Sequence, residues 1–279
     1  MRIAVAQVHP PTADPLAAVE KLRWLLGGLR AAAAAADLLV LPEAWLQAYH
    51  LSAALAHKLA APLPLAADAG GSPLERVAAL AAEFGVAVAL GFVERYDCRD
   101  CAASPPCAAA VYNSLALIDG AGRLVACYRK THLWGADERA IFSPGPAAQC
   151  RHRQGSDASP SSRDDAPAPP ARAPSPAFAP VRLPAFPDTP IGLLVCFDME
   201  FAEPSRLLAL AGAKLVIAST AMCEREAFAS RLHPALPGRL SVARNYDDAR
   251  RGGRRDGALG LVVAAEHLVR GHQPGLPRV

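Results

Sequence analysis

Three reactive side chains each come directly after a short apolar run in this sequence. Glu43 ends "LLVLPE", Lys130 ends "LVACYRK" and Cys196 ends "IGLLVC". In α/β proteins the ends of buried strands often carry functional groups, because ligands reach the sheet there. A carboxylate can serve as a general base, an ammonium can stabilise an oxyanion, and a thiol can act as a nucleophile. Each of the three is therefore a candidate catalytic residue.

Each residue also has an ordinary structural interpretation when it is taken alone. Glu43 and Lys130 fit solvated side chains at strand ends, where most Glu and Lys residues lie. Cys196 fits an inert buried thiol, which is the usual state of a cysteine in an apolar run. If Cys196 instead lies at a sharp strand-to-helix turn, its sulfur is exposed and the N–H of Phe197 can point at an oxyanion.

The motifs around these residues together resemble the carbon–nitrogen hydrolases of the nitrilase superfamily. Their order matches the family pattern, with "LPEAWLQAY" at 41–49, "YRKTHLWGADERAIFSPG" at 128–145 and "CFDMEFAEPSR" at 196–206. The resemblance covers residues 1–145 and 181–243. It implies a Glu–Lys–Cys triad in which Cys196 attacks the substrate carbon, Glu43 moves protons and Lys130 stabilises the oxyanion through a thioester pathway.

The resemblance also assigns supporting residues. Glu138 matches a second glutamate that orients substrate and base, although an exposed acid paired with Arg139 is an alternative. Phe197 is expected to supply its N–H to the oxyanion. Asp198 and Glu200 are expected to face away from the thiol and support the turn. Pocket walls are expected at five further positions, each of which could equally belong to the core: Tyr49, Trp134, Thr220, Ala221 and Met222.

The segment from Cys196 to Met222 most resembles the branch of small aliphatic amidases, which includes 5-aminopentanamidase-like and stereoselective amino-amide hydrolases. The expected function is hydrolysis of a small linear amide to an acid and ammonia, without a metal or organic cofactor. A nitrilase, a carbamoyl-amine hydrolase, an omega-amidase and a catalytically impaired interaction protein remain alternatives. The family resemblance also makes a homo-oligomer possible.

Strand and helix patterns alternate along the chain, which predicts an α/β protein. Strands are expected at 3–8, 86–93, 191–196 and 214–220, and a hairpin at 111–130. Helices are expected at 15–34 and after Ser72, where Pro73 and Glu75 complete a capping box and Gly85 suits the helix end. The resemblance implies a four-layer αββα sandwich of the nitrilase type.

Two segments depart from this order. Residues 146–180 are rich in Pro, Ala and Ser, which predicts a disordered surface insertion within a carbon–nitrogen hydrolase domain of residues 1–243. Residues 244–279 form an Arg/Gly-rich tail that departs from the family pattern. The C-terminal strands of the sandwich are therefore expected to be missing or atypical.

Composition narrows the remaining classes. A net charge of +3, from 29 basic and 26 acidic residues, does not favour nucleic acid or a membrane surface as a partner. The seven cysteines and the lack of an export signal predict a cytoplasmic protein with reduced thiols. A zinc site at Cys98, Cys101 and Cys107 lacks a second ligand pair. A papain-like pair of Cys196 with His132 leaves Glu43 and Lys130 without roles.

Overall fold

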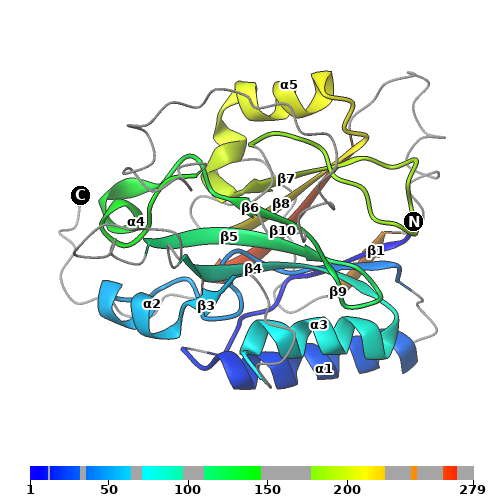
Figure 1. Ribbon diagram of the computed structural model, residues 1–279, viewed down its shortest axis with the longest axis horizontal. Coiled ribbons are helices and arrows are strands. Elements are labelled where there is room, and N and C mark those ends of the chain that lie inside the picture. Colours follow the sequence, from blue (N-terminus) through cyan, green and yellow to red (C-terminus); the bar gives the residue numbers. More distant parts are fainter. Residues whose placement is uncertain are drawn as a thin grey trace, which may run out of the picture.

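The computed structural model describes residues 1–11, 13–31, 36–63, 71–96, 110–145, 177–223, 240–243 and 260–268. In this part of the chain two β-sheets pack face to face, and helices cover the outer side of each (Figure 1). The layers therefore run helix, sheet, sheet, helix. The αββα sandwich expected from the sequence is confirmed.

The larger sheet combines parallel and antiparallel strands. Its path runs β6-β5-β4-β2-β1-β9, and β3 pairs with β4 beside this path. β1, β2 and β4 are parallel, whereas β5, β6 and β9 join antiparallel neighbours. The strands are β1 (Ile3–Ala6), β2 (Leu38–Val40), β3 (Ala61–Pro62), β4 (Ala87–Tyr96), β5 (Ala110–Ile118), β6 (Leu124–Arg129) and β9 (Leu240–Ala243).

The smaller sheet has the order β10-β8-β7, with parallel pairing throughout. Its strands are β7 (Ile191–Val195), β8 (Leu215–Cys223) and β10 (Gly260–Leu268). β7 and β8 are buried on both faces, which explains their continuous apolar sequence. β10 lies within the predicted tail of residues 244–279, so this tail contributes a strand to the sandwich.

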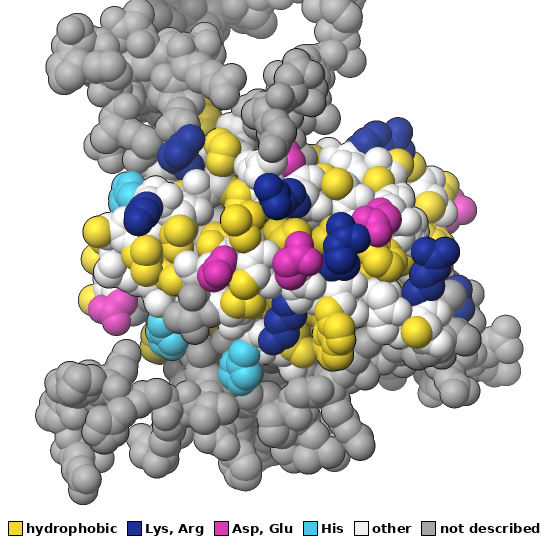
Figure 2. All heavy atoms as spheres, turned by 90° about the horizontal axis from the view of Figure 1, so that it is seen from below, with side chains coloured by type: hydrophobic (Ala, Val, Ile, Leu, Met, Phe, Trp, Pro, Cys, Tyr) yellow, Lys and Arg dark blue, Asp and Glu magenta, His cyan; other side chains and the backbone are white. Residues whose placement is uncertain are grey.

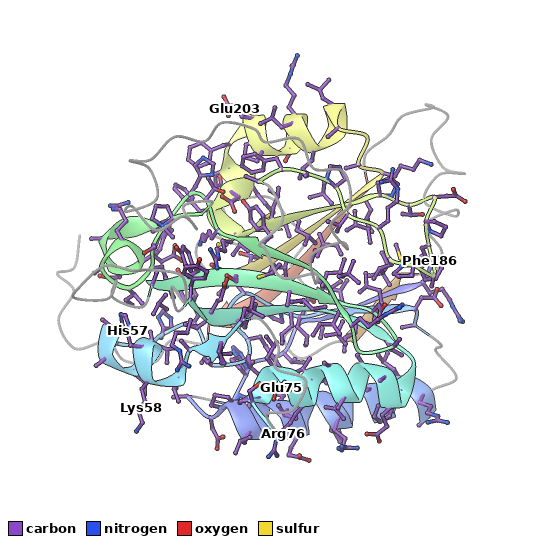
Figure 3. All side chains as sticks on the ribbon, viewed as in Figure 1. His57, Lys58, Glu75, Arg76, Phe186 and Glu203 are labelled. Atoms are coloured by element: carbon purple, nitrogen blue, oxygen red, sulfur yellow. The ribbon has the colours of Figure 1, made fainter. Side chains whose placement is uncertain are left out.

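Two long helices cover the larger sheet. α1 (Pro15–Ala31) turns a stripe of leucines toward it, including Leu22 and Leu26, and the predicted helix end at residue 34 lies outside the described residues. α3 (Pro73–Phe84) begins with the predicted capping box, in which Ser72 and Glu75 bond to each other's backbone, and Gly85 ends it in a left-handed conformation. Figure 3 shows Glu75 and Arg76 at the outer side of this layer.

The outer face of the helix pair α1 and α3 mixes apolar and charged side chains of both signs (Figure 2). Arg23 of α1 donates to Glu83 of α3 at 2.7 Å, which joins the two helices across their exposed side. Among the described residues of this face, Figure 2 shows no patch of one charge sign that would attract a polyanion.

The shorter helices lie near the ends of strands. They are α2 (Ala53–Leu59), α4 (Gly135–Ile141), α5 (Ala202–Leu210) and the 3₁₀ helix η2 (Cys196–Glu200). α5 covers the smaller sheet, where Leu208 packs over Gly192 of β7. Because η2 follows β7 directly, the chain turns sharply at Cys196, as the sequence predicts.

The predicted insertion is described only at its end. Residues 146–176 lie outside the described residues, as does the Cys98, Cys101 and Cys107 loop. Phe178 is described, and it packs half-buried against the core between the two sheets and near the Tyr128 ring. The chain therefore packs against the sandwich at residue 178, two residues before the predicted end of the insertion at residue 180.

Two leucines of α5 give a matched test of this packing. Leu208 is fully buried, whereas Leu210 is 73% exposed. We expect Leu208→Ala to lower the free energy of unfolding by about 2–5 kcal/mol, because it leaves a cavity over β7. We expect Leu210→Ala to change it by less than about 0.5 kcal/mol. Denaturant titration measures both, and equal losses would contradict the assignment of the buried face.

Candidate active site

Glu43 lies at the end of β2, in a turn that begins just after Pro42. Its side chain is completely buried. The turn crosses directly over Gly91 of β4, where a Cβ atom would lie 2.7 Å from the Cα of Glu43 and closer still to the carbonyl oxygen of Pro42. The missing side chain at Gly91 therefore leaves the space in which the Glu43 backbone sits.

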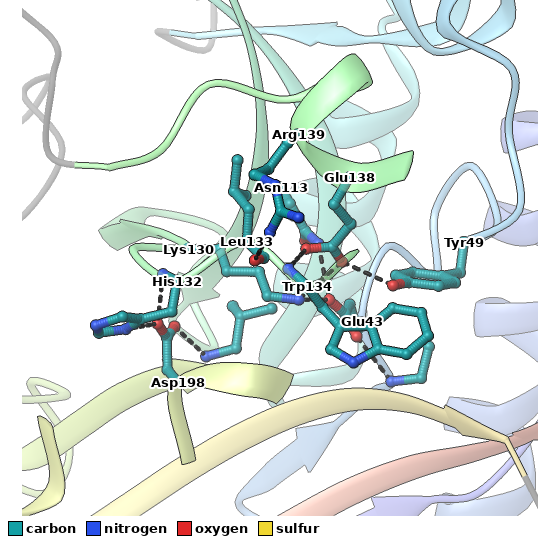
Figure 4. A network of polar contacts seen from close by, with 12 residues as sticks. Glu43, Tyr49, Asn113, Lys130, His132, Leu133, Trp134, Glu138, Arg139 and Asp198 are labelled. Atoms are coloured by element: carbon teal, nitrogen blue, oxygen red, sulfur yellow. Dashed lines mark hydrogen bonds and ion pairs between the residues drawn. The ribbon is translucent and has the colours of Figure 1, made fainter. Parts of the chain in front are cut away.

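Both carboxylate oxygens of Glu43 accept hydrogen bonds from groups on other elements (Figure 4). Oε1 accepts from Lys130 Nζ at 2.7 Å and from Asn113 Nδ2 at 2.7 Å. Oε2 accepts from the backbone N–H of Ala221 at 2.9 Å. The carboxylate is thus fixed by β5, by the end of β6 and by β8 of the other sheet.

Lys130 lies between two carboxylates. Its Nζ donates to Glu43 Oε1 at 2.7 Å and to Glu138 Oε1 at 2.8 Å, and its side chain is fully buried. Burial by itself lowers the pKa of Lys130, but the negative charges of Glu43 and Glu138 outweigh it and raise the pKa above its usual value. The ammonium therefore stays charged in the site.

Glu138 is a buried member of this cluster. The alternative interpretation, in which it is an exposed acid paired with Arg139, is wrong. It projects from α4 and also accepts from Tyr49 Oη at 2.7 Å and from the backbone N–H of Trp134 at 2.7 Å (Figure 4). Burial and the charge of Glu43 raise the pKa of Glu138, whereas Lys130 lowers it. Two carboxylates here share one ammonium.

Cys196 is the first residue of η2 and is held at φ 45°. A left-handed conformation is uncommon for a residue with a side chain, and such strain is often found at functional sites. The thiol is partly exposed and close enough to Glu43 and Lys130 for their charges to act on it. Burial, followed by the charge of Glu43, raises the pKa of the thiol, while Lys130 and Thr220 lower it.

Asp198 anchors the turn that begins at Cys196, which fits the expectation that it supports this turn. Its carboxylate accepts from the backbone N–H of Val195 at 3.1 Å and from the hydroxyl of Tyr128 at 2.9 Å. It also accepts from the backbone N–H of His132 at 2.9 Å and contacts the His132 ring at 2.8 Å. These contacts tie η2 to the segment that carries Lys130, and they engage His132 away from Cys196.

Phe197 and the expected pocket walls lie around this centre in different ways. Phe197 is the second residue of η2, where the backbone N–H groups have no partner within the helix. Trp134 is 44% exposed and Tyr49 is half-buried. Thr220 is fully buried, and Ala221 contributes its backbone N–H to Glu43. The backbone of Met222 lies in β8, and its side chain is outside the described part.

Two residues of the site were not predicted from the sequence. The pattern around Asn113 predicts only a strand, yet its amide donates to the Glu43 carboxylate. A polar amide inside the buried run "VYNSLALI" was the signal that could have drawn attention to it. Gly91 stands in "VALGFV", where a glycine in a strand interior indicates close approach of another backbone.

Within the described ranges, no cluster of three or more His, Cys, Asp or Glu side chains has the geometry of a metal site. No helix in those ranges is both long and apolar enough to cross a membrane.

Comparison with known sequences identifies the family. The carbon–nitrogen hydrolase family model matches residues 2–243. The chain belongs to the carbon–nitrogen hydrolase family. It is 32% identical to the "Hydrolase in pqqF 5′region" of Pseudomonas protegens, over 79% of this chain and 59% of that protein. It is also 32% identical to an (R)-stereoselective amidase of Pseudomonas sp., over 69% of this chain and 51% of that one.

A third relative is the human deaminated glutathione amidase, with 33% identity over 55% of this chain and 38% of that one. This carbon–nitrogen hydrolase thus spans between about two fifths and three fifths of the curated relatives it matches. Among solved structures, a variant of the nitrilase-superfamily amidase from Nesterenkonia AN1 gives a TM-score of 0.58 at 20% identity, over 95% of this chain and 76% of that one. These structures share the fold.

The opposing charges around Cys196 predict opposite effects on its reactivity. Glu43→Gln removes the negative charge that raises the thiol pKa, so we expect iodoacetamide to alkylate Cys196 about tenfold faster at pH 8. Lys130→Met removes the positive charge, so the thiol pKa rises further and alkylation is expected to be about tenfold slower. Mass spectrometry of the Cys196 peptide gives both rates.

Thermal unfolding of both variants serves as the control for intact structure. A change in the same direction for Glu43→Gln and Lys130→Met would contradict the electrostatic account, because the two residues carry opposite charges.

Proposed function

We propose that this chain hydrolyses the carbon–nitrogen bond of a small linear amide, giving an acid and ammonia through a thioester on Cys196. The observation that carries the proposal is the placement of Glu43. Its carboxylate is buried, bonded to the Lys130 ammonium, and close enough to act on the charge of the Cys196 thiol. A base, a cation and a nucleophile thus meet within one small volume, as acyl transfer requires.

In the first half of the proposed reaction the thiol proton moves to Glu43 while the sulfur attacks the amide carbon. Lys130 Nζ and the backbone N–H of Phe197 stabilise the negative charge that develops on the carbonyl oxygen. Glu43 then donates its proton to the departing nitrogen. The carbon–nitrogen bond breaks, ammonia leaves, and the acyl group remains on sulfur as a thioester.

In the second half water replaces ammonia. Glu43 accepts a proton from water as the oxygen attacks the thioester carbon, and the same two donors stabilise the oxyanion. The carbon–sulfur bond breaks, the acid is released, and the proton on Glu43 returns to the sulfur. Glu43 therefore alternates between base and acid, and the enzyme ends in its starting state.

Glu138 acts in this scheme as a positioning residue. It accepts a second hydrogen bond from Lys130 Nζ, in addition to the one that Glu43 accepts, and it is held in turn by Tyr49 and the backbone of Trp134. The ammonium is therefore kept at one point, where the oxyanion forms. The exposed side chain of Trp134 is proposed to border the route of the substrate to Cys196.

The relatives support an amide as substrate. Two of the similar proteins are amidases by description, and the Nesterenkonia enzyme is an amidase. A Glu→Gln variant of that enzyme carries acrylamide added at its active-site cysteine. The proposal for this chain is the small aliphatic amidase branch. Ammonia release from short amides, ω-amides, carbamoyl amines and nitriles would distinguish this branch from the alternatives, and no release from any of them would favour a catalytically impaired protein.

The triad is tested by three single substitutions. Cys196→Ala is expected to abolish amide hydrolysis because no nucleophile remains. Glu43→Gln is expected to do the same because no group accepts the thiol proton, and Lys130→Ala should lower kcat/KM by at least about 10²–10³ through loss of an oxyanion donor. Ammonia release gives the rates, and thermal unfolding shows which variants remain folded. Retained hydrolysis in folded Cys196→Ala would end the proposal.

Gly91 tests the position of the base without removing any polar group. In Gly91→Ala the added Cβ meets the backbone of Pro42 and Glu43, so Glu43 must move. We expect kcat/KM for the preferred amide to fall by about 10²-fold or more, since small displacements of reacting groups cost this much. Gly192→Ala is the control, because the atoms nearest to its added Cβ belong to the Leu208 side chain and not to a backbone. Equal activities in the two variants would contradict the role of Gly91.

A further inference from the structure

Thr220 has a buried hydroxyl that lacks a hydrogen-bond partner. In the part of the chain that the structure describes, three buried side-chain atoms are in this state: Asn113 Oδ1, Arg129 Nη1 and Thr220 Oγ1. Asn113 and Arg129 each use their other polar atoms, on Glu43 and Glu94 respectively. Thr220 has no other polar atom in its side chain. A buried polar group without a hydrogen-bond partner lowers the stability of the fold, and such groups are often kept because they have a function.

The strand register places Thr220 beside Cys196. β7 and β8 are parallel, and their last paired residues are Val195 and Ser219. The residues that follow this pair are Cys196, which begins η2, and Thr220, which continues β8. β8 also packs against η2. The hydroxyl and the thiol therefore come from the positions that follow the last paired residues of β8 and β7.

The two neighbours of Thr220 on β8 are already engaged. Ser219 donates its hydroxyl to the carbonyl oxygen of Leu41 at 2.9 Å, and Ala221 donates its N–H to Glu43 at 2.9 Å. Side chains alternate along a strand, so Thr220 points to the opposite side from Ser219. Of these three consecutive residues, Thr220 is the one whose side chain can interact with the Cys196 sulfur.

The interaction between the two side chains depends on the charge of the sulfur. Thr220 favours the anionic form and so lowers the thiol pKa, against the effects of burial and of Glu43. In the structure Thr220 Oγ1 forms no hydrogen bond, although it lies close enough to the thiol to act on its pKa. A thiol sulfur is a weak acceptor and hydrogen bonds to charged groups are stronger, so this hydroxyl is expected to bond to the sulfur once the sulfur is anionic.

We propose that Thr220 is a further catalytic residue, whose hydroxyl donates a hydrogen bond to the Cys196 sulfur whenever that sulfur carries negative charge. The proposal rests on the function proposed above and replaces the expected role of Thr220 as a wall for substrate. The bond forms when the thiol loses its proton and again when the sulfur leaves the thioester. At both moments the proton moves between sulfur and Glu43, and Thr220 keeps its own.

Alkylation of Cys196 in the absence of any amide substrate tests this role. Thr220→Val keeps the shape of the side chain and removes the hydroxyl, whereas Thr220→Ser keeps the hydroxyl. We expect iodoacetamide to react with Cys196 about tenfold slower in Thr220→Val between pH 7 and 9, with the pH profile moved to higher pH. Thr220→Ser is expected to react within about threefold of the unaltered protein, because its hydroxyl still reaches the sulfur.

Ser114→Ala is the matched control for loss of a buried hydroxyl. Ser114 lies on β5 and donates to Glu94 at 2.7 Å, where Arg129 also binds. In Ser114→Ala, iodoacetamide should alkylate Cys196 at the same rate as in the unaltered protein. Thermal unfolding shows whether each variant is folded, and mass spectrometry restricts the readout to the Cys196 peptide.

Two results would overturn the proposal. If Cys196 in Thr220→Val is alkylated as fast as in the unaltered protein while KM for the preferred amide rises, Thr220 contacts substrate and not the sulfur. If Thr220→Ser is slowed as much as Thr220→Val, the methyl group and packing matter, and the hydroxyl does not. Because alkylation needs no amide, a failure of the amide panel to reveal a substrate would contradict the proposed function without deciding the role of Thr220.

Discussion

The structure around the candidate site depends on one constraint, which is that a fully buried ammonium must be paired. Lys130 has no exposed surface, and it is stable there because Glu43 and Glu138 lie within hydrogen-bond distance. A buried charge without a partner costs several kcal/mol, so removal of either carboxylate changes the state of all three groups. The three residues come from the end of β2, the end of β6 and α4, and these elements must therefore assemble together.

The second sheet completes this arrangement. Ser219 and Ala221 of β8 donate to Leu41 and Glu43, which precede and enter the turn after β2. These two hydrogen bonds connect the sheets at the place where Glu43 is held. Asp198 makes a comparable connection from η2 to the end of β6. The positions of Glu43 and Cys196 are thus set by contacts between the sheets as well as by each loop.

Local sequence pattern predicts most of the longer elements and the reactive residues at their ends, but it does not predict α2, α4 or β10. Apolar runs ending at Glu43, Lys130 and Cys196 predicted strand ends, and the capping box at Ser72 predicted the start of α3. The partners of these residues were harder to predict. Asn113 acts on a carboxylate 70 positions away, and Gly91 makes room for a backbone from another segment.

Contacts made by backbone groups are still harder to predict from the sequence. Ala221 was expected to line a pocket, and it contacts Glu43 through an N–H that any residue except proline possesses. Its position could not be inferred from residue type. It follows from the register of β8 against β7 and from the packing of the two sheets, both of which are set by contacts distant in the chain.

The electrostatics of the site explain why a thiol lies beside a carboxylate that hinders its ionisation. Burial and Glu43 raise the pKa of Cys196, so the resting sulfur keeps its proton. Oxidation and unwanted alkylation proceed through the thiolate, and a protonated sulfur is less sensitive to both. In the proposed mechanism the same carboxylate is the group to which the proton moves, and Lys130 remains charged beside it to balance the anion. On that proposal, the carboxylate that suppresses reactivity at rest is the one that permits it when an electrophilic carbon arrives.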